Sequence, residues 1–272
     1  MKKNIYPKIS VVMSLCREGA VLLKRSIDSI LNQTFKDFEF IIIIDNPDNK
    51  GAISTIQQYK AKDSRIKMFI HKSNLGLAAS MNEAIKYARA DYIARQDADD
   101  VSLPDRLEKQ YKKMIEEHTI DVLGTGIIEV DDNERVLLKR YYKQEVGDEI
   151  KRYSPLGHPT VLVKREVFNK YGYYNVNLRE GLPEDYDLWC RWYLKGVKMC
   201  NINELLYKYY LGKKNNKAKV AKRVLLGTIK IKLRYASQLR FGILDYIYLL
   251  FEMFLLLLPT KLILILFYFF KK

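Results

Sequence analysis

The residues best placed to do chemistry are three carboxylates packed into four positions: Asp97, Asp99 and Asp100. They follow a short run from Tyr92 that predicts a buried strand. Like charges this close repel one another, so a chain holds them at little cost only where water or a cation neutralises them. After a strand, such a cluster can hold a divalent metal ion against a phosphate. The alternative is a solvated acidic turn that caps a helix beginning near Pro104.

The elements around this turn predict where it lies. Apolar runs predict strands over 9–13, 38–44, 66–70 and 92–96, and helical stripes follow them over 21–32, 52–59, 77–88 and 104–117. This alternation predicts an α/β fold, a parallel sheet with helices on both faces. Ligands bind such sheets at the carboxyl ends of the strands. Because Asp45, Asn74 and Asp97 each come after a strand, we expect them at one edge.

The pattern changes after residue 117. Short strands are predicted over 122–125, 127–130, 136–139 and 160–163, with one helix around 146–153 and another that runs to 194. We interpret the chain as a main domain over 1–207 and a C-terminal extension over 208–272.

The net charge of +15 belongs mostly to that extension. Residues 208–240 contain 11 Lys and Arg and no acid, whereas the chain up to Glu204 has 33 basic and 30 acidic residues. No helix-turn-helix, zinc-finger or RNA-stacking signature accompanies the basic segment, so nucleic acid is not expected as a partner. An anionic membrane surface fits better, because the next segment is apolar.

Residues 243–270 are strongly apolar but interrupted by Asp245, Glu252, Pro259 and Lys261. The stretches on either side of the interruption are about 16 and about 9 residues, and a membrane-spanning helix needs about 20. This predicts a membrane-lying or re-entrant pair of helices. The alternatives are a buried core helix, an oligomer interface or a tilted single span.

The cysteines indicate the compartment. Cys16, Cys190 and Cys200 lack a paired metal-ligand spacing, which is typical of a reducing environment. The N-terminus lacks the apolar run of a secretory signal. We therefore expect any catalysis in the cytoplasm.

Six segments together resemble a known family. They are 9–13 (ISVVM), 29–35 (SILNQTF), 37–42 (DFEFII), 74–77 (NLGL), 92–100 (YIARQDADD) and 184–189 (EDYDLW). In this order and spacing, residues from about 8 to 210 resemble the family 2 glycosyltransferases, which have the nucleotide-sugar-binding GT-A fold. The resemblance is greatest to the branch that builds bacterial capsule and lipopolysaccharide glycans.

The resemblance implies a nucleotide-binding edge. Asp45 matches the acidic residue that accepts a hydrogen bond from uracil, whose ring N–H cytosine lacks. Asn74 and Gly76 match the loop beside the nucleoside, where glycine lets the backbone approach a ligand closely. Without the family, Asp45 is a turn-initiating residue and the loop is an ordinary Asn/Gly turn.

The acidic turn matches the family's Asp-x-Asp motif through Asp97 and Asp99. This implies that Mg²⁺ or Mn²⁺ binds between these carboxylates and the donor diphosphate, where it neutralises the departing nucleotide. Asp100 is then a cap or a supporting residue. Arg95 shares a strand face with Asp97, and it either binds the diphosphate or pairs with a carboxylate.

Asp185 matches the family's catalytic base, which takes the proton of the acceptor hydroxyl and so leads to inversion at the anomeric carbon. Glu184 is expected to orient the acceptor or to raise the pKa of Asp185 by like charge. Alternatively, Glu184, Asp185 and Asp187 are first-turn acids that complement the helix dipole. His158 either contacts phosphate or acceptor, or is structural.

Two departures from the family pattern lie at the nucleobase end. Residues 14–18 (SLCRE) stand where many relatives have Pro-x-Tyr-Asn, and Ile44 stands where a second acid is usual. They leave the identity of the base open, although Asp45 is present.

These observations predict a metal-dependent inverting glycosyltransferase. It would move a sugar from a nucleotide donor, UDP-linked by the match at Asp45, to a lipid-linked or growing surface glycan at the cytoplasmic face of the membrane. One alternative is a membrane-surface binding protein on a degenerate transferase scaffold. The other is a sugar nucleotidyltransferase, but residues 14–19 contain one glycine and do not resemble its Gly-rich triphosphate loop.

Overall fold

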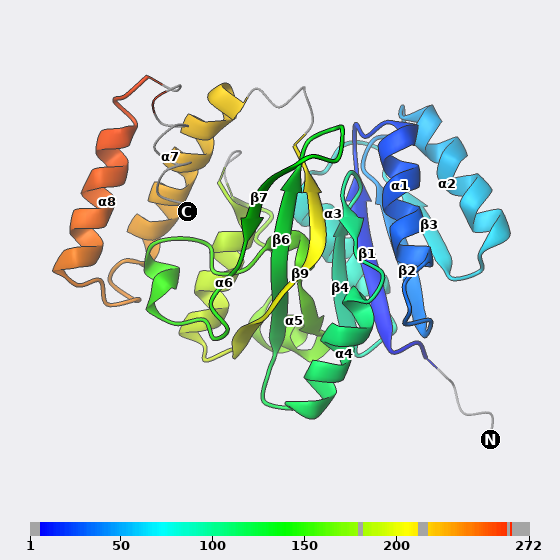
Figure 1. The fold of residues 1–272 in the computed structure, drawn as a ribbon, viewed down its shortest axis with the longest axis horizontal. Helices are drawn as coiled ribbons and strands as arrows, with labels where there is room; N and C mark the ends of the chain where they lie inside the picture. The colour runs from blue at the N-terminus through cyan, green and yellow to red at the C-terminus, as the bar shows by residue number, and fades with distance from the viewer. Residues whose placement is uncertain (1–5, 179–181, 212–216, 260–261, 263–272) are drawn as a thin grey trace.

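The first half of the chain forms the parallel side of one curled sheet (Figure 1). The computed structural model describes residues 6–178, 182–211, 217–259 and 262. The parallel strands are β1 (Ile9–Leu15), β2 (Phe38–Ile44), β3 (Ile66–Ile70) and β4 (Tyr92–Asp97). They lie in the order β3-β2-β1-β4, which confirms the prediction for this half.

The other half of the sheet is mixed, which corrects the prediction of a mostly parallel sheet. Its strands are β5 (Val101–Ser102), β6 (Val122–Val130), β7 (Val136–Arg140), β8 (Leu162–Lys164) and β9 (Met199–Tyr210). β8 runs antiparallel to β4 and to β6, whereas β6 and β9 are parallel. Antiparallel neighbours need no crossover helix, so the regular strand–helix alternation ends here.

Two predicted elements differ in detail. The strands expected over 122–125 and 127–130 are a single strand, β6, with irregular pairing on either side of Gly126. A Cβ at Gly126 would lie 2.9 Å from the carbonyl oxygen of Arg140, so only glycine fits at this crossing. The helix expected around 146–153 is a short 3₁₀ turn, η1 (Asp148–Lys151), and a second such turn, η2 (His158–Thr160), precedes β8.

Helices cover both faces of the sheet and bury two apolar cores. α1 (Ala20–Leu31), α2 (Lys50–Lys62) and α4 (Arg106–Glu116) pack on one face, and α3 (Leu77–Tyr87), α5 (Arg165–Tyr171) and α6 (Glu184–Leu194) pack on the other. Successive strand residues alternate between the two cores: Val12 and Ile41 belong to the α3–α6 side, and Val11 and Ile42 to the α1–α4 side.

The C-terminal part forms a helical hairpin of α7 (Lys217–Tyr235) and α8 (Ile243–Leu255) at one end of the molecule (Figure 1). Ile231 and Tyr235 of α7 belong to the same core as α6, and Leu225 packs against Leu249 of α8. Of the expected apolar segment, residues 260–261 and 263–270 lie outside the described residues. Among the helices that are described, none is both long and apolar enough to cross a membrane.

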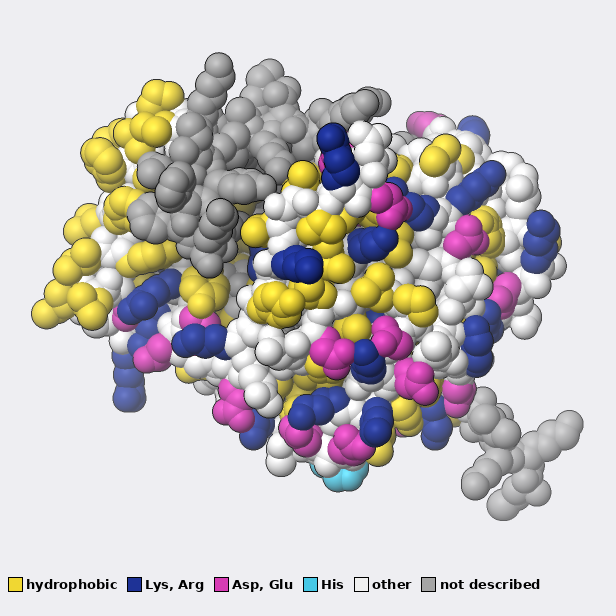
Figure 2. Space-filling view, in the orientation of Figure 1, with side chains coloured by type: hydrophobic (Ala, Val, Ile, Leu, Met, Phe, Trp, Pro, Cys, Tyr) yellow, Lys and Arg dark blue, Asp and Glu magenta, His cyan; other side chains and the backbone are white. Residues whose placement is uncertain are grey.

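Much of α8 presents apolar side chains to solvent, visible as a yellow group at the left of Figure 2. The exposed ones are Ile243, Leu244, Tyr246, Ile247, Tyr248, Leu250, Phe251, Met253, Phe254 and, just beyond the helix, Leu257. Soluble proteins rarely expose so continuous an apolar surface without a partner.

Candidate active site

The carboxyl ends of β2, β3 and β4 meet at one edge of the sheet, as predicted. β1 lies between β2 and β4, so Asp97 pairs with Ser14 on one side. On the other side, the backbone N–H of Asp45 donates to the carbonyl oxygen of Leu15 at 2.7 Å. Asp45 and Asp97 therefore flank the end of β1, and the loop after β3 closes beside Asp45.

Asp45 is buried, with 2% of its surface exposed, and its carboxylate holds the loop that precedes α3. Oδ1 accepts from the backbone N–H of Leu75 and Oδ2 from that of Gly76, each at 2.8 Å. Gly76 has a φ of +87°, which favours glycine, and a Cβ there would meet nothing within 4 Å. The loop thus turns tightly around Asp45 and leaves open space beside Gly76 for a ligand.

His71 is a buried partner of Asp45 that sequence reasoning missed. Its Nδ1 lies 2.7 Å from Asp45 Oδ1, and its Nε2 lies 2.9 Å from Oε2 of Glu83 on α3. The ring therefore lies between two carboxylates and connects the end of β2 to α3. Its place three residues before Asn74 was the available signal.

Asn74 and residues 14–18 meet at the rim of this edge. The exposed Asn74 donates through Nδ2 to Sγ of Cys16 at 2.9 Å. The carbonyl oxygen of Cys16 accepts from Asn46 and Asn49, so the segment that departs from the family pattern is fastened to the loops on both sides. The roles of Asp45, Asn74 and Gly76 in binding a nucleoside stay predictions.

Arg95 is buried and pairs with Asp97, the second of the two expectations for it. Nη1 lies 2.9 Å from Oδ2 and Nη2 lies 2.6 Å from Oδ1, which is a bidentate ion pair. The remaining guanidinium donor, Nε, is buried and has no partner among the described residues.

The other two acids of the turn differ in their surroundings. Burial, followed by the negative charges of Asp97 and Glu18, raises the pKa of Asp99 to about 6. Asp100 is fully buried; its Oδ1 accepts from the backbone N–H of Tyr210 at 2.9 Å, and its Oδ2 has no partner among the described residues. Asp100 thus joins the turn to the end of β9, and the N-cap of α4 is another residue, Asp105.

The first turn of α6 brings two more carboxylates to the same site. Burial, and next the charge of Asp185, raises the pKa of Glu184 to about 7, and burial raises the pKa of Asp185. Asp97 and Arg95 both act on these two pKa values, so the α6 acids lie near the acidic turn. The sheet and α6 therefore assemble acids that are about 90 residues apart in the chain.

His158 lies beneath the two acids of α6, Glu184 and Asp185. Its Nε2 is 2.8 Å from the hydroxyl of Tyr174, and its Nδ1 is 3.9 Å from Oε1 of Glu184. Burial, and then the positive charge of Arg95, lowers the pKa of His158 well below its ordinary value. His158 is therefore a neutral group that packs below the α6 acids, and contact with phosphate or acceptor stays a prediction.

Comparison with known proteins decides the family. The family model of glycosyl transferase family 2 matches residues 10–176, more than half of the chain. The chain belongs to glycosyl transferase family 2. It is 38% identical over 240 residues to an uncharacterised glycosyltransferase of Methanocaldococcus jannaschii, covering 86% of this chain and 82% of that protein.

Two Escherichia coli relatives act in glycan synthesis by name. The transferase is 34% identical to the O-antigen biosynthesis glycosyltransferase WbnJ, over 79% of this chain and 84% of that one. It is 26% identical to UDP-Gal:alpha-D-GlcNAc-diphosphoundecaprenol beta-1,3-galactosyltransferase, over 94% of this chain and 93% of that protein. The predicted resemblance to family 2 and to its envelope-glycan branch is thus confirmed.

The fold also matches a solved glycosyltransferase. The mannosyltransferase PcManGT from Pyrobaculum calidifontis, in complex with GDP-Man and Mn²⁺, superposes with a TM-score of 0.66 at 15% identity, over 94% of this chain and 72% of that chain. The likeness establishes the GT-A-like fold, a curled mixed sheet flanked by helices.

The acidic turn fits a divalent metal ion that binds together with a ligand. In the described part of the transferase, no three His, Cys, Asp or Glu side chains are arranged to hold a metal ion by themselves. Mg²⁺ is commonly held by one or two carboxylates together with substrate phosphates and water. Burial and the charges of Asp97 and Glu18 raise the pKa of Asp99, and a bound cation would favour its ionised form.

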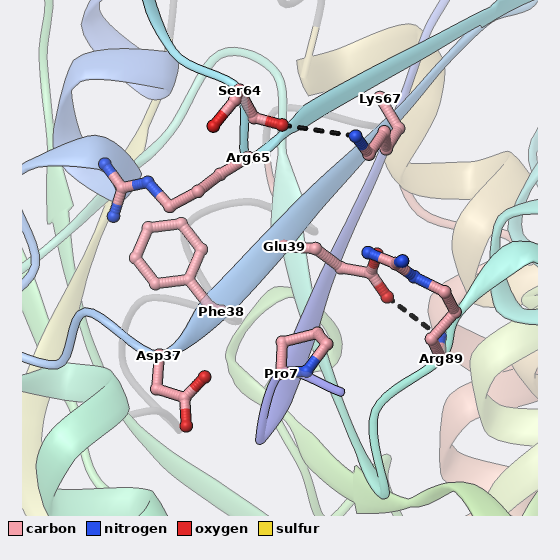
Figure 3. Close-up of a pocket in the computed structure, with 8 residues that line it drawn as sticks. All are labelled: Pro7, Asp37, Phe38, Glu39, Ser64, Arg65, Lys67 and Arg89. Atoms are coloured by element: carbon pink, nitrogen blue, oxygen red, sulfur yellow. Dashed lines mark hydrogen bonds and ion pairs between the residues drawn. The ribbon is translucent and has the colours of Figure 1, made fainter. Parts of the chain in front are cut away.

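A small cavity lies at the opposite edge of the sheet and is not the active site (Figure 3). It has a volume of about 210 Å³ and lies at the amino ends of β2 and β3. Two of its lining cations are already paired, Arg89 with Glu39 and Arg65 with Asp63. These contacts make it a structural feature of the strand starts.

The two contacts of His71 generate a test of the buried Asp45 group. In His71→Ala, the buried carboxylate of Asp45 loses a hydrogen-bond partner and Glu83 loses its contact with the ring, and we expect the free energy of unfolding to fall by about 2–4 kcal/mol. Urea denaturation followed by circular dichroism measures this. The control is Tyr87→Phe, which removes only an exposed hydroxyl donor to Glu83 and should cost less than about 0.5 kcal/mol. Equal losses in the two variants would contradict the bridging role.

Proposed function

We propose that this family 2 transferase is metal-dependent and inverting, and that it moves a sugar from a UDP-sugar to a lipid-linked or growing surface glycan. The observation that supports this most is the meeting of two acidic groups around Arg95: the Asp97–Asp99 turn and the α6 pair of Glu184 and Asp185. The Asp97–Asp99 turn suits a metal ion together with a diphosphate, and the α6 pair suits removal of a proton from an acceptor hydroxyl.

The donor's base would bind beside Asp45. Three hydrogen-bond donors already occupy its carboxylate, two at Oδ1 and one at Oδ2. A carboxylate offers about four acceptor positions, so one at Oδ2 is left for the single ring N–H of uracil. Asn74 and the open space at Gly76 would accommodate the rest of the nucleoside. The UDP-Gal donor in the name of the second Escherichia coli relative supports this choice of base.

The diphosphate would bind at Arg95, Asp97 and Asp99. When bound, Mg²⁺ or Mn²⁺ supplies Lewis-acid stabilisation of the leaving diphosphate. Arg95 orients Asp97 through its bidentate pair and offers its free Nε–H to a phosphate oxygen. Asp99 would contribute a carboxylate whose ionised form a bound cation favours.

Asp185 would accept the proton of the acceptor hydroxyl. The helix N-terminus and the charge of Arg95 favour its ionised form, whereas burial opposes it, so the carboxylate is more basic than one in water. Glu184 shares this environment and would orient the acceptor. Attack from the side opposite the departing nucleotide inverts the anomeric carbon.

The C-terminal hairpin would contact both the membrane and the acceptor. The apolar face of α8 would lie in the lipid interface, with basic residues of the 208–240 segment near anionic headgroups. In this proposal, the transferase acts at the cytoplasmic face of the cell membrane. In the same proposal, residues 1–207 are the transferase domain and 208–272 are the membrane-binding extension.

The same exposed face of α8 favours one second candidate, a membrane-binding protein whose transferase site is unused. Turnover separates the two. A degenerate scaffold would bind vesicles but release no nucleotide from any sugar donor.

A donor panel tests the function and its metal. We expect one UDP-sugar to raise the melting temperature of the transferase only with Mn²⁺ or Mg²⁺, and UDP to be released when acceptor is added. Asp99→Asn should remove the metal-dependent part of the shift and lower turnover by about 100-fold. Stabilisation by GDP-sugars alone would reject the choice of base, and full turnover in EDTA would reject the metal.

The pH profile tests the base. Because Asp185 accepts a proton only when ionised, we expect kcat/KM to rise with pH along an acidic limb that lies above the ordinary range of an aspartate, since burial raises the pKa of Asp185. Glu184→Gln removes a neighbouring negative charge, which lowers the pKa of Asp185 and moves the limb to lower pH. Asp185→Asn should lower kcat by about 1,000-fold. An unchanged kcat in that variant would refute the assignment.

Vesicle flotation tests the hairpin. We expect the transferase to float with vesicles containing anionic lipid, and the double variant Leu244→Glu/Leu250→Glu to stay in the soluble fraction. Val21→Glu is the matched control, because Val21 is 82% exposed on α1, outside the hairpin. Equal binding to neutral and anionic vesicles would remove the electrostatic part of the proposal.

A further inference from the structure

Asp187 is a buried acid in the first turn of α6, two residues after Asp185. Its side chain is 0% exposed, and both carboxylate oxygens are engaged. Oδ2 accepts from Nε of Arg191 on the same helix at 2.9 Å. Oδ1 accepts from the hydroxyl of Tyr235 at 2.8 Å and from Nη1 of Arg234 at 3.3 Å, both at the end of α7.

A helix-dipole role does not account for this arrangement. An acid that complements a helix dipole acts from the surface and needs no partner on another helix. A buried carboxylate is costly without donors, and two of the three donors to Asp187 come from α7. We name these four residues, Asp187, Arg191, Arg234 and Tyr235, the Asp187 cluster.

The cluster is connected to the acceptor side of the site. Arg191 also donates through Nη2 to the carbonyl oxygen of Tyr173 at 2.8 Å. The next residue, Tyr174, contacts His158 through its hydroxyl at 2.8 Å, and His158 lies beside Glu184. The contacts of Asp187 therefore connect the helix turn that carries Glu184 and Asp185 with His158, which lies beneath these two acids.

The cluster is also connected to α8. Lys232, one turn before Tyr235 on α7, is 1% exposed at its side chain and pairs with Glu252 of α8 at 2.5 Å. The ammonium lies 4.9 Å from the ring centroid of Tyr248. The ion pair fixes α8 on α7, and the Asp187 cluster fixes α7 on α6, so the hairpin and the α6 acids are joined through buried contacts.

We propose that Asp187 is a positioning residue that holds the Asp185 carboxylate in place through α7, which makes the C-terminal hairpin part of the catalytic unit rather than only an attachment to lipid. The proposal rests on the assignment of Asp185 as the base. A displacement of about 1 Å at a reacting group can cost about 100-fold in rate, so a loosened first turn should show in kcat. The affinity for the sugar donor should not change, because the residues proposed to bind it lie at the carboxyl ends of the strands.

The test removes one hydroxyl from α7 in the full-length protein. Tyr235→Phe deletes the 2.8 Å donor to Asp187 and keeps the ring in the core. We expect kcat to fall about tenfold, with donor KM and the donor-induced melting shift unchanged. Tyr248→Phe is the matched control: it removes a hydroxyl from the same hairpin but leaves the ring against Lys232, and kcat should stay within about twofold.

A second pair of variants separates charge from packing. Arg234→Ala removes the other α7 donor and should lower kcat, whereas Arg234→Lys retains a cation and should restore most of it. If Tyr235→Phe lowers the melting temperature with kcat unchanged, the cluster is only structural and the proposal is wrong. A rise in donor KM as the main effect would also overturn it.

Hydrogen exchange gives a readout that does not depend on turnover. In Tyr235→Phe, amides of α6 around Asp185 should exchange faster than in the wild type and in Tyr248→Phe. Unchanged exchange there rejects the connection even in an active enzyme. If the wild-type protein transfers no sugar at all, the proposed function fails first, and the positioning role fails with it.

Discussion

The guanidinium of Arg95 is the charge on which the arrangement of the site depends. Burial raises the pKa of Asp99, Glu184 and Asp185, and the positive charge of Arg95 opposes each of these rises. Its bidentate pair also orients Asp97. A cation among acids from two distant segments favours their ionised forms, whereas burial and like charges favour protonation.

Arg95 is itself held by buried polar contacts that no motif indicates. Arg106, at the start of α4, is fully buried and donates to the carbonyl oxygen of Arg95 and to the hydroxyl of Ser102, each at 2.6 Å. At the start of the acidic turn, the N–H of Asp97 donates to the hydroxyl of Tyr207 on β9 at 3.1 Å. The backbone of the turn is thus fixed between α4 and β9 before any ligand binds.

The two halves of the fold differ in how far they could be predicted. Strands such as β2 are nearly continuous apolar runs buried on both faces, so composition alone identifies them. β9 mixes polar and apolar residues over twelve positions without regular alternation, and it pairs with β5 and β6. Its existence depends on partners far away in the chain, and a local pattern carries little information about them.

The sequence by itself determined which residue types stand at the strand ends, because apolar runs specify strands and a parallel sheet places their carboxyl ends at one edge. It therefore located Asp45 and Asp97, whereas the α6 acids were indicated by the family resemblance. Only the tertiary structure decided which of them are already engaged: Asp45 by His71, Asp97 by Arg95 and Asp187 by α7. Hydrogen bonds and ion pairs between distant segments depend on distances of about 3 Å, and those are set by packing rather than by local sequence.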